Sequence, residues 1–450
     1  MKKPLFGEKH YYMYLFETMF DSTVAALVSG TFFAKLTTSL GISDATTAIL
    51  AQVGNLTIVL YLLSAFISRS RRIKPIVFSM QLAYQFLISL IYILPLFAFK
   101  VGTTEFLFFV LILTAKAISF CYGGAKSGWY VANIPEEKRA SFFGISQGIV
   151  YGVIFVVDLL VGKMIDRMEE NGNLVGAFTA IFLILLALTA LNVTTILLTR
   201  TPSEDFHGSS TERVTTIFKD LWKHDGFRTL TLQRLIFSLA SLATIGYLST
   251  YLILDIGISM SDAALFAALH SAVYAIFLAL WGKIGERFSL LKIYGIGMIL
   301  VALSSVTVIF MSPEHYLVPY LIHIVLINCG NAAYGVGYML TYRILPERYY
   351  AAASAFATIP ISLLNFFGTL ALAPLFNYLK YTLDSTLFGR TFYAQQTFAV
   401  IATVLHVLSI TYLLLVVYKK LQAAMDAGDN GILKEKREQD ESSTPIDAAE

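Results

Sequence analysis

The sequence is poor in charge for its length. Charged residues make up 14% of the 450 residues and hydrophobic residues 56%, whereas soluble domains average about 25% charged residues. The mean hydropathy is +0.68. A soluble enzyme of this length is therefore excluded. A disordered chain is excluded as well, because the hydrophobicity is high and aromatic residues make up 14% of the chain.

Residue patterns that mark other protein classes are also missing. The two cysteines, Cys121 and Cys329, both lie in apolar runs, so we expect no disulfide framework and no metal cluster. A net charge of +3 is too small for nucleic-acid binding. The sequence has no Gly-x-x-x-x-Gly-Lys-Ser/Thr motif, so ATP is not the direct energy source. No His, Asp or Glu cluster has catalytic spacing, so we expect no enzyme and no cofactor.

Long apolar runs dominate the chain instead. A helix needs about 20 mostly apolar residues to cross a bilayer, and the runs show none of the two-residue alternation of a membrane β-barrel. We therefore predict an all-α polytopic membrane protein with twelve transmembrane helices. The predicted spans are 11–34, 46–67, 75–98, 105–131, 141–164, 175–199, 229–254, 262–284, 291–312, 317–342, 350–376 and 396–418.

The positions of lysine and arginine predict the orientation, because cytoplasmic loops are rich in both. With both termini inside, the inner segments carry 24 of the 33 basic residues and the outer segments carry six. We therefore expect a multi-pass protein of the cell (cytoplasmic) membrane with cytoplasmic termini. The first apolar segment is long enough to span and lacks a small-residue cleavage site, so we expect it to act as an anchor.

The polar segments predict four parts of the chain. Residues 1–200 and 229–420 each form a six-helix bundle. Residues 201–228 form a cytoplasmic linker whose amphipathic stretch, 214–223, is expected to lie along the membrane surface. The tail, 421–450, is rich in charge and small residues and is expected to be disordered.

The two halves repeat each other. Leu40-Gly-Ile-Ser precedes the second span and Ile256-Gly-Ile-Ser precedes the eighth, with the glycines 216 positions apart. The loops after these spans match at an offset of 217, where Ala65 corresponds to Gly282. Matches at nearly one offset indicate two six-helix halves related by a parallel pseudo-two-fold axis.

The loop Gly282-Lys-Ile-Gly-Glu-Arg-Phe-Ser-Leu-Leu-Lys292 resembles the inner-loop motif of the major facilitator superfamily. The resemblance implies the major facilitator fold, with spans one, four, seven and ten around a central cavity. Gly282, Glu286, Arg287 and Lys292 then form a gating loop, in which Glu286 pairs with a basic residue of a neighbouring loop in one conformation. The alternative is ordinary interfacial charge. The loop after span two departs from the pattern at Ala65 and Arg69.

Charges within the spans are candidates for function, because each costs at least about 2.5–3.5 kcal/mol at the membrane centre. Glu17 and Asp21 share one face of the first span. Their repulsion would favour protonation of one of them, so we predict that this pair is the proton site. For Glu17 the alternative is a snorkelling interfacial acid. The candidates are Glu17, Asp21, Lys116, Lys126, Asp158, Arg234, His270 and His323.

Lys116 and Asp158 lie at similar predicted depths, about 6 Å apart along the membrane normal. We predict a salt bridge between them, with a structural or a substrate-binding role. Arg234 occupies nearly the same position in the second half as Glu17 occupies in the first. The alternative interpretation of Arg234 is a basic residue that only follows the positive-inside rule. The two histidines carry protons or, alternatively, serve as hydrogen-bonded packing.

Aromatic and amide residues on the spans that the resemblance places around the cavity are expected to form its wall. They include Tyr122, Trp129, Asn328, Asn331 and Tyr334. Such side chains suit sugars and other ring-bearing solutes, although they also occur as interfacial belts.

These features together predict a function. We expect a monomeric secondary active transporter for a small organic, sugar-like solute, coupled to protons as a symporter. The alternatives are a drug or metabolite efflux antiporter and a transport-inactive receptor or chaperone that keeps the fold.

Overall fold

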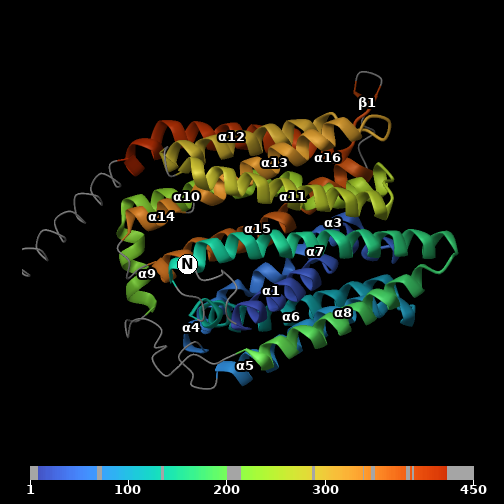
Figure 1. Ribbon diagram of the computed structural model, residues 1–450. Helices are drawn as coiled ribbons and strands as arrows, with labels where there is room; N and C mark the ends of the chain where they lie inside the picture. Colours follow the sequence, from blue (N-terminus) through green and yellow to red (C-terminus); the bar gives the residue numbers. More distant parts are fainter. Residues whose placement is uncertain are drawn as a thin grey trace, which may run out of the picture.

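The computed structural model describes residues 9–67, 73–132, 136–199, 214–285, 289–337, 339–345, 350–381, 386–387 and 390–422. Most helices run along one common direction (Figure 1). We call the end where α1 begins the termini end. We call the opposite end, where the short strands β1 (Thr386–Leu387) and β2 (Arg390–Thr391) pair, the hairpin end.

The first bundle is formed by helices from the first half of the chain, several of them continued by 3₁₀ segments. They are α1 (Lys9–Leu27), α2 (Gly30–Ser39), α3 (Asp44–Gln52), η1 (Val53–Leu63), α4 (Ser64–Ile67), α5 (Ile73–Ser89), η2 (Leu90–Tyr92), η3 (Leu94–Phe97), α6 (Val101–Ala132), α7 (Glu136–Glu170) and α8 (Leu174–Leu198).

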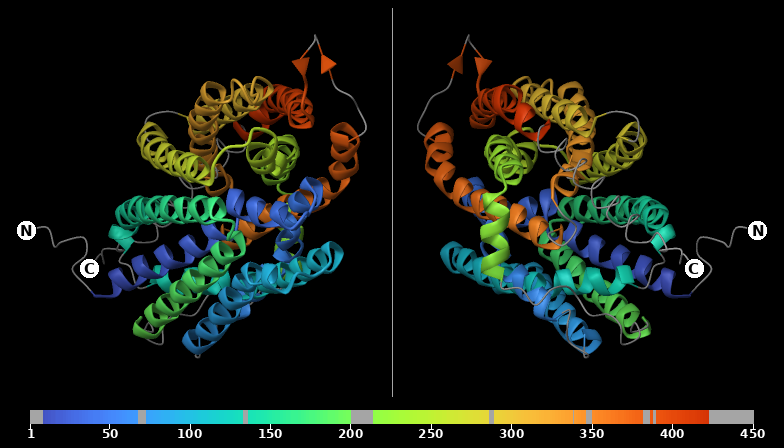
Figure 2. Two further views of the ribbon diagram at one scale, coloured as in Figure 1. Left: turned by 90° about the vertical axis from the view of Figure 1, so that its right-hand side faces the viewer. Right: turned by 90° about the vertical axis from the view of Figure 1, so that its left-hand side faces the viewer.

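The second bundle follows α9 (Val214–Lys223), the helix predicted at 214–223. It consists of α10 (Asp225–Thr250), η4 (Tyr251–Asp255), α11 (Met260–Gly285), α12 (Leu290–Ile309), α13 (Leu317–Gly337), α14 (Met339–Ile344), α15 (Tyr350–Tyr381), α16 (Ala394–Tyr412) and η6 (Leu413–Val417). Viewed end-on, the two sets of helices form two groups (Figure 2). Helix α15 packs across the groups against α3 and η1.

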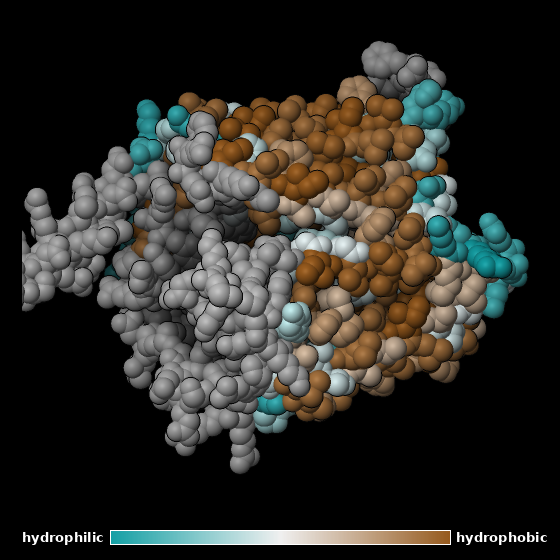
Figure 3. Space-filling view, in the orientation of Figure 1, coloured by the Kyte–Doolittle hydropathy of each residue, from teal (hydrophilic) through white to brown (hydrophobic). Residues whose placement is uncertain are grey.

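Within the described residues, eleven helices are long and apolar enough to cross a membrane. A broad hydrophobic belt covers the middle of the face seen in Figure 3, and hydrophilic residues gather at the hairpin end. The predicted all-α membrane fold is therefore confirmed. One boundary differs: the first predicted span, 11–34, is not one continuous helix. It breaks after Leu27 and restarts at Gly30, whose φ of +57° only glycine adopts readily.

The predicted repeat is visible in the backbone. Gly41 and Gly257 have almost the same left-handed φ, +75° and +76°, and each ends one helix before the next begins. The serines two positions later both cap the new helix. Ser43 Oγ accepts from the amide of Thr46 at 3.2 Å, and Ser259 Oγ accepts from that of Asp262 at 3.0 Å.

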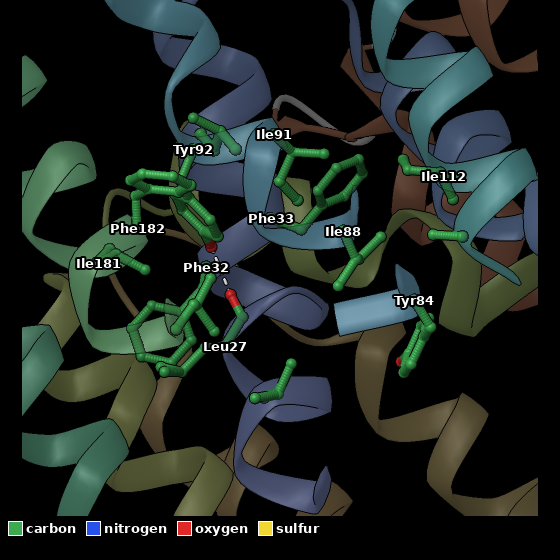
Figure 4. Packing of buried hydrophobic residues seen from close by; sticks show 14 of the residues in the cluster. Leu27, Phe32, Phe33, Tyr84, Ile88, Ile91, Tyr92, Ile112, Ile181 and Phe182 are labelled. Atoms are coloured by element: carbon green, nitrogen blue, oxygen red, sulfur yellow. Dashed lines mark hydrogen bonds between the residues drawn. The ribbon is translucent and has the colours of Figure 1, made fainter. Parts of the chain in front are cut away.

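The break between α1 and α2 is held by the hydrophobic core of the first bundle (Figure 4). The hydroxyl of Tyr92 donates a hydrogen bond to the carbonyl of Leu27, one of the groups left unpaired at the end of α1. Phe32 and Phe33 of α2 are buried in the same cluster, and Phe33 packs edge-on against Phe108 of α6. The break is therefore a packed feature of the fold.

Candidate functional site

Helices α1 and α6 bring three of the predicted interior charges together. The ammonium of Lys126 on α6 lies 2.8 Å from Glu17 Oε1 and 2.7 Å from Asp21 Oδ2. The two carboxylates share one face of α1, as their spacing predicts. One lysine therefore bridges both acids.

Two glutamines on α5 complete this arrangement. Gln81 Nε2 and Gln85 Nε2 donate to Asp21 Oδ1 at 2.8 and 2.9 Å. Gln81 Oε1 accepts from Lys126 at 3.1 Å and from the hydroxyl of Tyr122. Neither glutamine was predicted, although two amides one turn apart in an apolar helix are a detectable signal. We call these residues the acid–lysine cluster: Glu17, Asp21, Gln81, Gln85, Tyr122 and Lys126.

The acid–lysine cluster is mostly shielded from solvent. The side chains of Glu17, Lys126 and Asp21 are 3%, 12% and 28% exposed, so Asp21 is its most accessible charge. With both acids ionised, the three charges sum to −1. Removing one partner of a buried ion pair costs about 3–5 kcal/mol, so these residues hold α1 and α6 together. Asn192 of α8 also donates to the backbone carbonyl of Glu17 at 2.9 Å.

The predicted ion pair between Lys116 and Asp158 is wrong. The ammonium of Lys116 lies 5.7 Å from the centre of the Tyr84 ring, and its side chain packs over Gly54, where a Cβ would lie 2.5 Å from Lys116 Cγ. Asp158 lines a crevice beside α1, α2 and α11. The depths matched, but α6 packs against η1 and α5 while α7 packs against α1 and α11. The two side chains therefore point to different parts of the molecule.

The second bundle has a related polar core. The hydroxyl of Tyr294 on α12 donates to Gln233 Oε1, as Tyr122 does to Gln81 in the first bundle. Arg234 is 1% exposed and donates to Thr341 Oγ1 at 3.1 Å. Arg234 is therefore held inside the second bundle in this conformation.

The two predicted histidines face each other on α11 and α13, with ring centres 6.3 Å apart. His270 Nδ1 lies 2.6 Å from the side-chain nitrogen of Asn328, and His323 Nδ1 lies 2.9 Å from the carbonyl of Ser304. Both rings therefore serve as hydrogen-bonded packing here. Asn331 lies one turn further along α13 and is half-buried.

The predicted aromatic wall is divided between core and accessible rings. Trp129 is fully buried, and its ring centre lies 4.9 Å from that of Tyr130, which packs against Tyr14 at 5.0 Å. Tyr334 of α13 is partly exposed and stacks on Phe237 at 5.0 Å. Tyr14 and Tyr334 thus keep exposed surface that Trp129 lacks.

The predicted gating loop is described only at its edges. Gly282 belongs to α11, and Lys292 is an exposed residue in the first turn of α12. Glu286 and Arg287 lie outside the described residues. The latch at this loop therefore stays a prediction.

The two bundles are joined by an ion-pair network at the hairpin end. Lys380 of α15 pairs with Asp44 of α3 in the other bundle and lies 3.3 Å from Asp255 Oδ2. Gln395 Nε2 donates to the same Asp255 oxygen at 3.2 Å. We call Asp44, Asp255, Lys380 and Gln395 the hairpin-end clamp. It was not predicted, because each charge alone resembles one at a membrane boundary.

A second contact joins the bundles at the same end. Asp166 of α7 accepts hydrogen bonds from the amides of Met260 and Ser261, at 2.9 and 2.8 Å, and so caps α11 across the interface. Gly162, one turn earlier, packs so closely that a Cβ would lie 2.7 Å from the carbonyl oxygen of Met260. The bundles are therefore in direct contact at the hairpin end.

The described helices form two groups in contact at the hairpin end, and eleven of them are long and apolar enough to span a membrane, which defines a polytopic α-helical membrane protein. The particular architecture is the fold of FucP, a major facilitator superfamily transporter whose solved structure superposes with a TM-score of 0.58 at 12% identity. No family model matches the sequence, and no curated protein matches it.

Several other solved structures share this fold. A D-xylose–proton symporter superposes with a TM-score of 0.64 and 14% identity, covering 90% of this chain and 96% of that one. The nucleoside transporter NupG superposes with a TM-score of 0.60 and 12% identity, covering 90% of this chain and 98% of that one. A bacterial homologue of the human lysosomal transporter Spinster, in an inward-facing and unoccupied conformation, superposes with a TM-score of 0.61 and 16% identity. The match covers 93% of this chain and 98% of that one. At these identities the likeness establishes the fold alone.

Proposed function

We propose that this protein is a secondary active transporter that moves a small organic solute across the cell membrane by alternating access of its two bundles. The major facilitator fold supports this proposal, as do the names of the similar structures, which are transporters or symporters. The acid–lysine cluster is the observation that supports the proposal most strongly. A protein that only needed a scaffold would gain little from burying two acids and a lysine in a membrane helix bundle.

We also propose that the transporter is a proton symporter and that Glu17 carries the proton. The net charge of −1 in the acid–lysine cluster falls to zero when one acid binds a proton. Asp21 accepts hydrogen bonds from Lys126 and both glutamines, whereas the carboxylate of Glu17 accepts one from Lys126. Asp21 is therefore better stabilised as an anion. Protonation of Glu17 weakens its ion pair and loosens α1 from α6.

The arrangement of the contacts supports a direction of access. The hairpin-end clamp and the Asp166 cap close the hairpin end. If the basic-residue bias holds, the termini end is cytoplasmic and this conformation faces inward. We propose that residues 1–200 and 229–420 move as two bodies, with 201–228 as the connecting segment, and that one copy of the chain is sufficient for transport.

The solute is proposed to be small, hydroxylated and sugar-like. The partly exposed rings of Tyr14 and Tyr334, together with the amide of Asn331, offer stacking surfaces and hydrogen-bonding groups.

Transport by the purified protein in liposomes tests the proposal. With an inward proton gradient, the wild type is expected to accumulate at least one solute of a panel of sugars, nucleosides and small polyols. Glu17→Gln is expected to lose accumulation but to keep counterflow exchange. The control is Glu169→Gln, because Glu169 pairs with Lys35 at 2.6 Å on the exposed hairpin end.

Other outcomes separate the alternatives. If Glu17→Gln accumulates solute like the wild type, the proton site lies elsewhere. Expulsion of solute driven by an inward proton gradient indicates an antiporter. Solute binding without movement in either mode indicates a receptor that keeps the fold.

A further inference from the structure

A crevice of about 420 Å³ lies between the bundles, beside the break that separates α1 from α2. Its walls come from α1, α2 and α7 of the first bundle and from α11 of the second. The polar residues that line it are Ser22, Ser29, Thr31, Tyr151, Asp158 and Ser271.

Asp158 is the one acid of the crevice and lacks a compensating charge there. It is 4% exposed, and its Oδ1 accepts no hydrogen bond from any described residue. The described residues that line the crevice include no lysine, arginine or histidine, and Tyr151 is their only other titratable side chain. Burying a carboxylate without a partner is costly, so this crevice is electrostatically incomplete.

The break between α1 and α2 also lines the crevice. Helix α1 stops at Leu27, and Ala25 and Ala26 of its last turn line the crevice. The C-terminal end of α1 and the N-terminal end of α2, where Gly30 and Thr31 line the crevice, bring partial charges of opposite sign, so the charge of the crevice comes from Asp158. Breaks between helices are recurring sites for cations and for polar parts of solutes in transporters.

The crevice is also lined by residues with hydroxyl groups. These residues include Ser22, Thr31 and Tyr151. The ring of Tyr151 meets that of Tyr274 of α11 edge-on across the bundle interface, with centres 6.4 Å apart. A molecule in the crevice would therefore contact both bundles, and its binding would depend on their relative position.

The size of the crevice indicates the size of its ligand. A volume of about 420 Å³ falls in the range of small-molecule pockets, about 300–1,000 Å³. A single water occupies about 30 Å³, so a bare metal ion would fill only a small part of the space.

The acid–lysine cluster is unsuited to an anionic ligand. Its one positive charge, on Lys126, already pairs with both Glu17 and Asp21.

We propose that the crevice binds the ammonium group of a small amine-bearing solute. The ammonium pairs with the carboxylate of Asp158 near the end of α1, and hydroxyl groups on the solute bond to those of Ser22, Thr31 and Tyr151. This inference names the solute class of the transporter proposed above and rests on that function. A hydroxylated amine, such as an amino sugar, satisfies both.

Thermal stabilisation by matched pairs of solutes tests the inference. The pairs differ by one amine: glucosamine and glucose, ethanolamine and ethylene glycol, cyclohexylamine and cyclohexanol. Amines are expected to raise the melting temperature of the wild type, while their alcohol counterparts do not. Asp158→Asn is expected to need at least tenfold more amine for half-maximal stabilisation, and Asp158→Glu to keep a measurable response. Asp220→Asn is the matched control, because Asp220 is exposed on α9 and loses the same charge.

Four results would overturn the inference. The first two are equal stabilisation by amine and alcohol, and an unchanged amine response in Asp158→Asn. The third is stabilisation by sodium chloride, but not by potassium chloride, that is lost in Asp158→Asn. The fourth is the absence of stabilisation by any amine. Failure of the proposed function is distinguishable, because the liposomes then take up no solute at all. Uptake of a neutral solute that is independent of Asp158 keeps the function and removes only this inference.

Discussion

The hairpin-end clamp provides the sharpest test of alternating access, because one side chain joins the two bundles. The side chain of Lys380 is 18% exposed, that of Asp44 is 2% exposed and that of Asp255 is 16% exposed. Replacing Lys380 with methionine keeps the length of the side chain and removes its charge. Asp44 is then left buried without its cation for as long as the bundles stay in contact.

The burial of Asp44 sets the free-energy cost of removing the charge of Lys380. Removing one partner of a buried pair costs about 3–5 kcal/mol, and the partial exposure of Lys380 places this case near the lower value, about 3 kcal/mol. The cost arises only while the hairpin end is closed, since opening returns Asp44 to water. At about 1.4 kcal/mol per factor of ten, the equilibrium shifts roughly 100-fold toward the conformation open at the hairpin end.

Distances between spin labels at the hairpin end measure this shift. Glu170→Cys at the end of α7 and Glu314→Cys in the turn before α13 are exposed positions on different bundles. The labels are placed after the native cysteines, Cys121 and Cys329, have been replaced by alanine. The expected result in Lys380→Met is a longer distance population that is minor in the parent protein.

The control is Lys35→Met. Lys35 is also 18% exposed and pairs with Glu169 at 2.6 Å, but both residues belong to the first bundle. It should leave the distances unchanged, and Lys380→Arg should restore the closed population. If Lys380→Met gives the parent distance distribution, or if Lys35→Met widens it equally, the clamp does not hold the bundles together.

Four further predictions follow from individual residues. Gly162→Val places a Cβ 2.7 Å from a carbonyl oxygen of α11 and should disfavour the closed hairpin end by about 1–3 kcal/mol. The expected readout is the same longer spin-label distance, and an unchanged distance contradicts the close contact. Gln81→Leu should lower stability by about 1–3 kcal/mol, because it leaves the buried hydroxyl of Tyr122 without its acceptor. A thiol-reactive dye that follows exposure of the cysteines measures this, and an unchanged melting temperature contradicts it. Glu286→Gln should favour opening at the termini end and lower turnover, and unchanged distances across that end would remove the predicted latch. Glu170→Cys should react with an impermeant thiol reagent on intact cells while Ser209→Cys should not; the reverse pattern inverts the topology.

The hydropathy of the chain determined that it is an all-helical membrane protein, since a bilayer selects about 20 apolar residues per span whatever the helix packs against. The spacing of Glu17 and Asp21 likewise placed them on one helix face. The repeated Gly-Ile-Ser pattern predicted the symmetry, because Gly41 and Gly257 each occupy a backbone conformation that other residues avoid. These features depend on neighbouring residues along the chain.

The partners of the buried charges were decided only by tertiary structure. Sequence position sets the depth of a residue in the membrane, and by depth alone Lys116 suited Asp158. Which helices are neighbours, and how each is rotated about its axis, depends on packing between distant segments. The side chain of Lys116 packs over Gly54 of η1, while Lys126, further along the same helix, faces α1 and binds Glu17 and Asp21. Asp158 consequently faces the crevice between the bundles, where the described lining residues supply no positive charge.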